Sequence, residues 1–505
     1  MDIDLPPAAT PAQPNRRIIV TASSPYDLEQ LANNWEGRSK VNRLIFVAVS
    51  SPSLCGPALT LALAAIKQLT LDTNLYQEVF QMYRQHVNAI EGGREQDPTA
   101  VAWYESVKGN EVPLDRAWLE QAKKDAQSGK EKLEVELRGY TTNLIKESIR
   151  MGYRDLARFQ YRCGELQDAV RSYTKSREYC TTSQHVLDMC LGVIEIALDM
   201  NNYAFVRNYV VKAESAVDAA QSSSSSKPRQ APVLLPGMVA PAQDPIEAAK
   251  ERERKIVQER LTAAGGVAHL GSGSFDKAAF AFTDLGSEAL NAGTSHFIPA
   301  GDIALYAVLT SLACFDRVQL RTRVLENSNL RPFLDLEPYL RDIVRAFYDS
   351  KFKLGLELLS RYEHRPLLDI HVAPHVGTLL RLIRQRALLA YFQPFASVSL
   401  SRMAAAFGID ESQTHATLEP EVIELIERGY LKARIDSAQG TLVANKKDPR
   451  GEAFKRALDE GEKMQKKVIA SQLRMKLLRN DVIVKATRAS QQQQQQQQPQ
   501  ILDSD

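Results

Sequence analysis

The fold of this chain is decided by residues 375–448, which read HVGTLLRLIRQRALLAYFQPFASVSLSRMAAAFGIDESQTHATLEPEVIELIERGYLKARIDSAQGTLVANKKD. The apolar run from Val376 to Tyr391 predicts a helix that stops near Pro394, because proline has no backbone N–H to donate. A second helix is expected from about Ser399, which suits an N-cap, to Phe407, and Gly408 suits its C-terminal stop.

A third helix and a hairpin follow in the same stretch. The helix begins near Pro420, since proline is favoured in a first helical turn, and it ends near Gly429. Two short strands, Lys432 to Asp436 and Thr441 to Asn445, are joined by a turn over Ser437 to Gly440. Three helices and a two-stranded wing predict a winged helix.

The charge of the third helix argues against DNA as the partner of this module. A recognition helix needs Lys or Arg facing phosphates and bases. This helix sets four acids against Arg428 alone, namely Glu419, Glu421, Glu424 and Glu427. We therefore expect no nucleic-acid partner. A wing strand offers backbone groups on which another protein can build, which favours a protein–protein module.

Length and composition indicate a multi-domain globular protein. The chain has 505 residues, with 44% apolar residues, 25% charged residues and a net charge of +2, which gives no pull toward nucleic acid or membrane. The longest apolar stretch, Gly56 to Ile66, is too short to span a bilayer. We expect a soluble protein of the cytoplasm and nucleus. Its cysteines form no CxxC pair and are expected to be reduced, buried thiols: Cys55, Cys163, Cys180, Cys190 and Cys314.

The repeats before the winged helix are carried by a recurrent turn, in which a large apolar residue is followed three positions later by a small or branched one. The five occurrences are Leu166/Ala169, Tyr203/Val206, Phe275/Ala278, Phe315/Val318 and Phe352/Gly355. Their spacing is near-regular, apart from one gap that a Ser- and Pro-rich insert explains. This period is typical of a helical-repeat solenoid. The alternative is a non-repeating helical bundle with coincidental turns.

The predicted fold is mostly α-helical, with a TPR-like solenoid, a winged helix and a long C-terminal helix. In chain order, we expect a disordered tail (1–17), an N-terminal helical region (18–113) that ends in a polar loop (92–114), TPR-like repeats (114–365) with a disordered insert (219–246), the winged-helix part (366–448), a C-terminal bundling helix (449–482) and a disordered Gln-rich tail (483–505).

The C-terminal helix is expected over Glu452 to about Asn480, after a break at Asp448–Gly451. Its apolar residues read as one stripe, which either packs back on the chain or bundles with partner helices. We favour partner helices, because nothing nearby in the sequence complements the stripe. The candidate partner-binding residues, taken from the wing and this helix, are Leu431, Ile435, Leu442, Val443, Met464, Val468, Leu473 and Leu477.

The residues support no reaction. His364, His371 and His375 cluster in the sequence, but they lie near prolines and lack the HExxH spacing of a zinc site. The chain has no His-x-His followed at a distance by Asp, which is the layout of an isopeptidase metal site, and no GxSxG or phosphate-binding loop. We expect neither an enzyme nor a bound metal or cofactor.

Helical repeats that end in a winged helix and a further C-terminal helix resemble the PCI family. This family provides scaffold subunits of the proteasome lid, the COP-nine signalosome and a translation-initiation complex. Several stretches are similar to the signalosome branch: Trp35–Arg38, Arg43–Ala48, Met151–Ala157, Cys163–Glu165, Tyr173–Cys180 and Thr310–Leu320. Trp35 is a departure, since family members usually have tyrosine there.

This resemblance implies a non-catalytic subunit. The signalosome removes the ubiquitin-like protein Nedd8 from cullins in ubiquitin ligases, and its isopeptidase chemistry belongs to a different, zinc-bearing subunit. The implied partners are the other PCI subunits, that zinc-bearing subunit and, indirectly, cullin-RING ligases. The alternatives are a subunit of the proteasome lid or of a translation-initiation complex.

Overall fold

A computed structural model describes residues 26–94, 97–109, 112–225, 245–286, 298–409, 418–445, 449–480 and 482. The predicted tails at 1–17 and 483–505 lie outside the described residues. The structure separates into two compact units, residues 1–431 and 432–505. The predicted fold class is confirmed: the described part is mostly helical, with helical repeats, a small three-stranded sheet and a long C-terminal helix.

The first unit begins with a group of five helices that has its own core. They are α1 (Leu28–Asn33), α2 (Gly37–Ser50), α3 (Pro52–Leu69), α4 (Thr73–Glu91) and α5 (Pro98–Val107). The prediction of a loop over 92–114 is wrong for the residues of α5, which form a helix. Its proline lies in the first turn, and its Trp103 ring packs so closely on Gly56 of α3 that a Cβ there would lie 2.3 Å from it. Tertiary packing thus overrides the polar surroundings of this segment.

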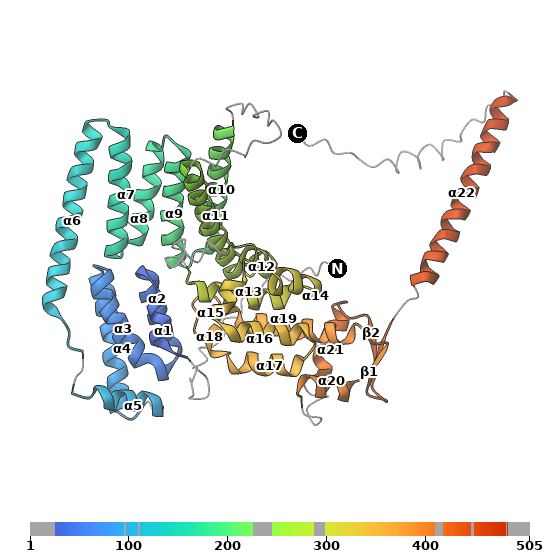
Figure 1. The fold of residues 1–505 in the computed structure, drawn as a ribbon, viewed down its shortest axis with the longest axis horizontal. Helices are drawn as coiled ribbons and strands as arrows, with labels where there is room; N and C mark the ends of the chain where they lie inside the picture. Colours follow the sequence, from blue (N-terminus) through green and yellow to red (C-terminus); the bar gives the residue numbers. More distant parts are fainter. Residues whose placement is uncertain are drawn as a thin grey trace, which may run out of the picture. The chain divides into compact units, whose positions relative to one another are not determined.

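The helical repeats follow. They are α6 (Arg116–Thr142), α7 (Lys146–Cys163), α8 (Leu166–Ser176), η1 (Arg177–Tyr179), α9 (Ser183–Asp199), α10 (Tyr203–Ser225), α11 (Pro245–Gly271), α12 (Phe275–Thr283) and α13 (Ala300–Cys314). Each of α6 to α10 packs on the next helix along the chain, and Figure 1 shows these helices side by side. The described residues therefore form the expected solenoid.

The predicted insert begins later than expected. Residues 219–225 continue α10, and Pro245 already opens α11. The alanines and serines after position 218 can extend a helix that no proline interrupts before Pro228. The remaining insert, 226–244, lies outside the described residues.

Four of the five recurrent turns share one geometry. The large apolar residue is the first residue of its helix, and the residue two positions before it has a positive φ: Gly164 (88°), Asn201 (54°), Gly273 (77°) and Ser350 (61°). In each turn the next amide donates to the carbonyl five residues earlier, as Lys351 N donates to Ala346 O at 2.8 Å. This is a Schellman turn, which closes one helix and sets the start of the next.

The fifth turn, Phe315/Val318, was predicted wrongly. Phe315 caps α13 with an extended backbone, and the next helix begins two residues later at Arg317. Phe315 is buried, but Val318 faces solvent with 73% of its surface exposed. The residue types and the spacing of this turn therefore match the other four turns, but the turn lacks the left-handed residue that defines them.

Ser350→Gly is expected to stabilise the fold by about 1 kcal/mol, because a non-glycine residue in the left-handed region costs about 1–2 kcal/mol. The measurement is thermal unfolding of the purified chain. Ser215, which is exposed within α10, provides the matched control. Ser215→Gly should lower stability by about 0.5 kcal/mol, because glycine is unfavourable inside a helix. If Ser350→Gly destabilised the chain as Ser215→Gly does, the backbone of Ser350 would not be strained.

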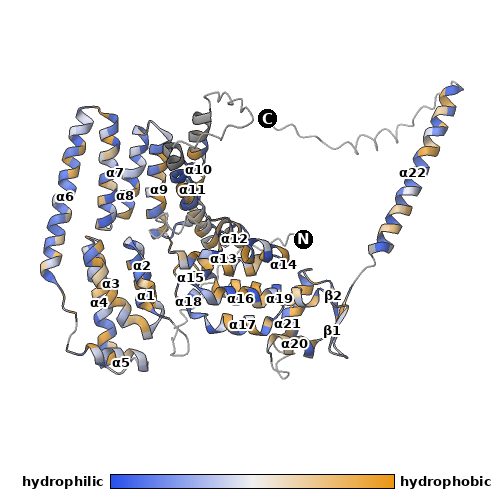
Figure 2. Cartoon of the chain, viewed as in Figure 1, coloured by the Kyte–Doolittle hydropathy of each residue, from blue (hydrophilic) through white to orange (hydrophobic). Residues whose placement is uncertain are grey.

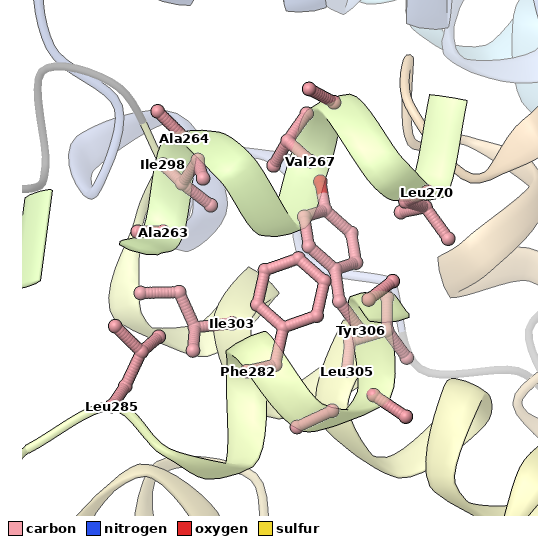
Figure 3. Close-up of a cluster of buried hydrophobic side chains, with 14 of the residues drawn as sticks. Ala263, Ala264, Val267, Leu270, Phe282, Leu285, Ile298, Ile303, Leu305 and Tyr306 are labelled. Carbon is pink, nitrogen blue, oxygen red and sulfur yellow. The ribbon is translucent and has the colours of Figure 1, made fainter. Parts of the chain in front are cut away.

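The core of the repeats is centred on α13, which is mostly apolar and buried on all sides. Helix α6, in contrast, is largely hydrophilic (Figure 2). All but the first two residues of α13 are buried. Figure 3 shows the Phe282 ring of α12 against the Tyr306 ring of α13, and their centroids lie 5.5 Å apart. A helix that is apolar on every side needs neighbours on every side, and this places α13 at the centre of the first unit.

Short helices connect α13 to the winged helix. They are α14 (Arg317–Gln319), the π-helical η4 (Leu320–Leu325), α15 (Arg331–Leu336), α16 (Pro338–Tyr348), α17 (Phe352–Arg361), α18 (His364–Leu367) and η5 (Ala373–His375). The winged-helix helices that end this unit are α19 (Val376–Phe392), α20 (Leu400–Phe407) and α21 (Glu419–Glu427), with the unpredicted strand β1 (Ser397–Ser399) before α20. As predicted, Gly408 closes α20 in the left-handed region and a proline lies in the first turn of α21.

The second unit opens with the predicted hairpin. Strands β2 (Ala433–Asp436) and β3 (Thr441–Ala444) pair antiparallel, with Ala433 opposite Ala444 and Asp436 opposite Thr441. Helix α22 (Pro449–Arg479) follows. The expected break before it is wrong, because Pro449 begins the helix, where a missing N–H costs nothing.

Candidate protein-interaction surfaces

The hairpin residues predicted to bind partners divide between its two faces. Leu442 is fully buried and Leu431, just before the hairpin, is 7% exposed, so these two support the fold rather than offer contacts. A partner-binding role for these two residues stays a prediction. Ile435 lies opposite Leu442 on the same face and is half-buried. Val443 is exposed on the other face, opposite Arg434, because successive side chains of a strand alternate.

Strand β2 lies at the edge of its sheet. Within the described residues it pairs with β3 alone. An edge strand presents backbone N–H and C=O groups that a strand of another chain can pair with. The partner-binding role of this edge stays a prediction.

Helix α22 exposes its apolar residues over its whole length. The exposed set is Phe454, Leu458, Met464, Val468, Ile469, Leu473, Met475 and Leu478, while Leu477 is half-buried. The prediction of a single stripe is too narrow. A helix turns about 100° per residue, so Val468 and Leu473 point about 140° apart. A band this wide suits a helix that contacts neighbours on more than one side.

The acids of α21 are less available than the sequence suggested. Glu421 pairs with Arg384 of α19 at 2.9 Å, and Glu424 pairs with Arg428 at 2.6 Å. Only Glu427 of the four predicted acids is fully exposed. The helix is therefore tied to α19 by an ion pair, and two of its four acids are paired with arginines.

Sequence reasoning missed a buried ionic cluster that joins distant parts of the first unit. We define the ionic cluster as Arg43 of α2, Asp302 and Tyr306 of α13, Arg365 of α18 and Asp369. Asp302 is fully buried and accepts hydrogen bonds from both arginines. Arg43 also donates to Asp369 at 3.1 Å, and the Tyr306 hydroxyl donates to the same carboxylate at 2.8 Å.

Opposite charges stabilise the ionised forms of Arg43 and Asp369. Burial alone would lower the pKa of Arg43, but the carboxylates of Asp302 and Asp369 raise it above its ordinary value. Burial likewise opposes ionisation of Asp369, yet Arg43 and its other neighbours hold the pKa of Asp369 below its usual range. Such a cluster fixes geometry, because each charge is tolerated only with its partners in place.

The neighbouring His371 should make stability depend on pH. Burial and the charge of Arg43 lower the pKa of His371 to about 4, against about 6.5 in an unfolded chain. The folded state therefore binds fewer protons than the unfolded state between these values, so stability should fall as pH drops from about 6.5 toward 4. Denaturant unfolding at pH 7 and pH 5 measures this change. His371→Gln should show a smaller loss, and an equal loss would contradict the assignment.

Neither metal chemistry nor thiol chemistry is favoured by the described side chains. No cluster of His, Cys, Asp and Glu among them could hold a metal ion. Cys190 and Cys314 are buried, but Cys55, Cys163 and Cys180 are only half-buried, which corrects their predicted burial. Burial raises the pKa of Cys163 and of Cys190 to about 11, so these thiols are protonated at neutral pH and are poor nucleophiles. None of the described helices has the length and apolar character that a bilayer crossing requires.

Comparisons with known proteins agree with this architecture. The family model for 26S proteasome subunit RPN7 matches residues 115–323, and the PCI domain model matches residues 359–446. COP9 signalosome complex subunit 1 of Arabidopsis thaliana is 36% identical, over 94% of each chain. COP9 signalosome complex subunit 1b of Drosophila melanogaster is 33% identical, over 96% of this chain and 92% of the relative. The 26S proteasome non-ATPase regulatory subunit 6 of Caenorhabditis elegans is 23% identical, over 70% of this chain and 78% of the relative.

Helical repeats followed by a PCI domain define the class to which this protein belongs, the PCI proteins. The sequence identity of 36% and 33% to the two signalosome relatives extends over nearly the whole chain, so the family within this class can be stated. The chain belongs to the COP9 signalosome complex subunit 1 family. The proteasome relatives match at lower identity and over a smaller part of the chain.

Proposed function

We propose that this chain is a non-catalytic scaffold subunit of a signalosome, and that it supports removal of Nedd8 from cullins and so regulates cullin-RING ligases. Its partners in the complex are the other signalosome subunits, namely PCI subunits and the zinc isopeptidase subunit, and it meets cullin-RING ligases indirectly. The proposal includes location in the cytoplasm and nucleus. Family membership supports the choice of complex.

The observation that carries the scaffold role is the apolar band of α22. Exposed apolar side chains along a long helix are unfavourable in water and mark an interaction site. Basic residues at several of the remaining positions keep the free helix soluble, among them Lys463, Lys467 and Arg474. Burial of this band among partner helices would hold the subunit in the complex.

An activity assay separates a scaffold from an enzyme. The purified chain should not cleave a neddylated cullin, with or without added zinc. A complex reconstituted with the zinc isopeptidase subunit should cleave it, and omission of this chain should reduce the rate. Cleavage by the isolated chain, after rigorous removal of partner subunits, would overturn the proposal.

A further inference from the structure

A cleft lies within the first unit. It has a volume of about 670 Å³, within the range of pockets that hold ligands. Its walls come from α1 and α3 on one side and from the segment that runs from α15 to α18 on the other. The cleft therefore lies where the N-terminal helices meet the end of the repeats.

The walls of the cleft carry more negative than positive charge. Asp27, Glu29 and Glu337 line it, against the single cation Arg365. Arg365 is already paired with the buried Asp302 of the ionic cluster. The carboxylate of Asp302 thus balances the charge of Arg365, and the remaining charged side chains of the cleft are carboxylates.

Glu337 is the carboxylate with the strongest need for a partner. The side chain of Asp27 accepts from the backbone amides of Glu29 and Gln30, at 3.1 and 3.2 Å. Glu337 is half-buried, and its carboxylate makes no hydrogen bond or ion pair with the residues that the structure describes. Burial raises the pKa of Glu337 above its ordinary value, as expected for a desolvated acid without a close counter-ion.

Aromatic rings complete the lining. Tyr339 and Tyr362 both line the cleft and stack with ring centroids 4.1 Å apart at an interplanar angle of 19°. Aromatic faces attract cations, and they attract the planar guanidinium group more often than an ammonium group. A carboxylate beside stacked tyrosines is thus complementary to arginine.

We propose that this cleft binds an arginine side chain presented by a short segment of a partner protein, with Glu337 as its counter-ion and the Tyr339–Tyr362 pair as its aromatic support. Charge complementarity and cleft size select this occupant. The inference goes beyond the scaffold role proposed above, since it adds a peptide site remote in sequence from α22.

A fluorescent peptide tests the proposal on the full-length chain. The probe is a blocked, fluorescein-labelled peptide with a central arginine flanked by leucine and alanine, and its control carries citrulline, which is neutral and nearly the same shape. Anisotropy titration should show at least about tenfold tighter binding of the arginine peptide, a difference of about 1.4 kcal/mol. Equal binding of the two peptides would overturn the proposal.

Two substitutions identify the site. Glu337→Gln should abolish the preference for arginine, and unchanged circular dichroism and Tm would show that the fold is intact. Glu357→Gln, on the exposed face of α17, is the matched control and should leave binding unchanged. Retained preference in Glu337→Gln would contradict the assignment. Arginine binding that appears only after deletion of residues 1–25 would assign the cleft to this chain's own Arg16 and Arg17 and overturn the choice of a partner protein.

Discussion

Asp302→Ala is expected to destabilise the protein by about 3–5 kcal/mol, the usual cost of breaking a buried ion pair. The change removes the carboxylate that accepts from both Arg43 and Arg365, and it leaves two buried cations with fewer counter-charges. Thermal unfolding should show a Tm lower by about 5–10 °C. Hydrogen exchange should be faster in α2, because Arg43 is its link to the ionic cluster.

An exposed ion pair provides the control for this loss. Asp284 pairs with Arg323 at 2.9 Å, and both side chains are exposed to solvent. Asp284→Ala should therefore cost no more than about 1 kcal/mol. If Asp302→Ala were as mild as Asp284→Ala, the ionic cluster would not hold the N-terminal helices to the repeats.

Changing Val468, Leu473 and Leu477 together to Asp is expected to release the subunit from its complex while leaving the free chain folded. The first two side chains are exposed and the third is half-buried, so little internal packing is lost. In a bundle of helices each new carboxylate would be buried without a partner, at a cost of several kcal/mol. Co-purification with partner subunits measures release, and circular dichroism of the free chain measures folding.

A second triple variant controls for the change in charge. Lys463, Lys467 and Arg474 lie on the polar side of α22, and changing them to Gln lowers the net charge by the same amount as three new Asp residues. This variant should still assemble. If the Asp variant unfolds the free chain, the apolar band packs internally. If the Asp variant assembles fully, α22 is not the attachment site.

The winged helix could be predicted because its signals are local. Gly408 in the left-handed region and a proline at the start of α21 mark helix ends within a few residues of the helices they cap. Strand β1 was missed, because a segment of three residues has no periodicity of its own. The Phe315/Val318 turn was predicted wrongly because its residue types match those of the other turns, while its backbone geometry differs.

The ionic cluster could not be assembled from the sequence, because its partners are 259 and 326 positions apart along the chain. A signal was nevertheless present. Asp302 is a single charge inside an otherwise apolar stretch, and such a charge is buried only when it is paired. The sequence could therefore mark Asp302 as paired without naming its partners. The cleft beside Arg365 depends on the same long-range packing.

The mass of the native assembly tests the scaffold account most directly. The tagged chain, purified from its own cells under mild conditions, should elute as a multi-subunit complex that contains the zinc isopeptidase subunit and other PCI subunits. The variant with Asp at 468, 473 and 477 should elute as a free, folded subunit. A wild-type chain that elutes alone at the mass of its own polypeptide would contradict the account.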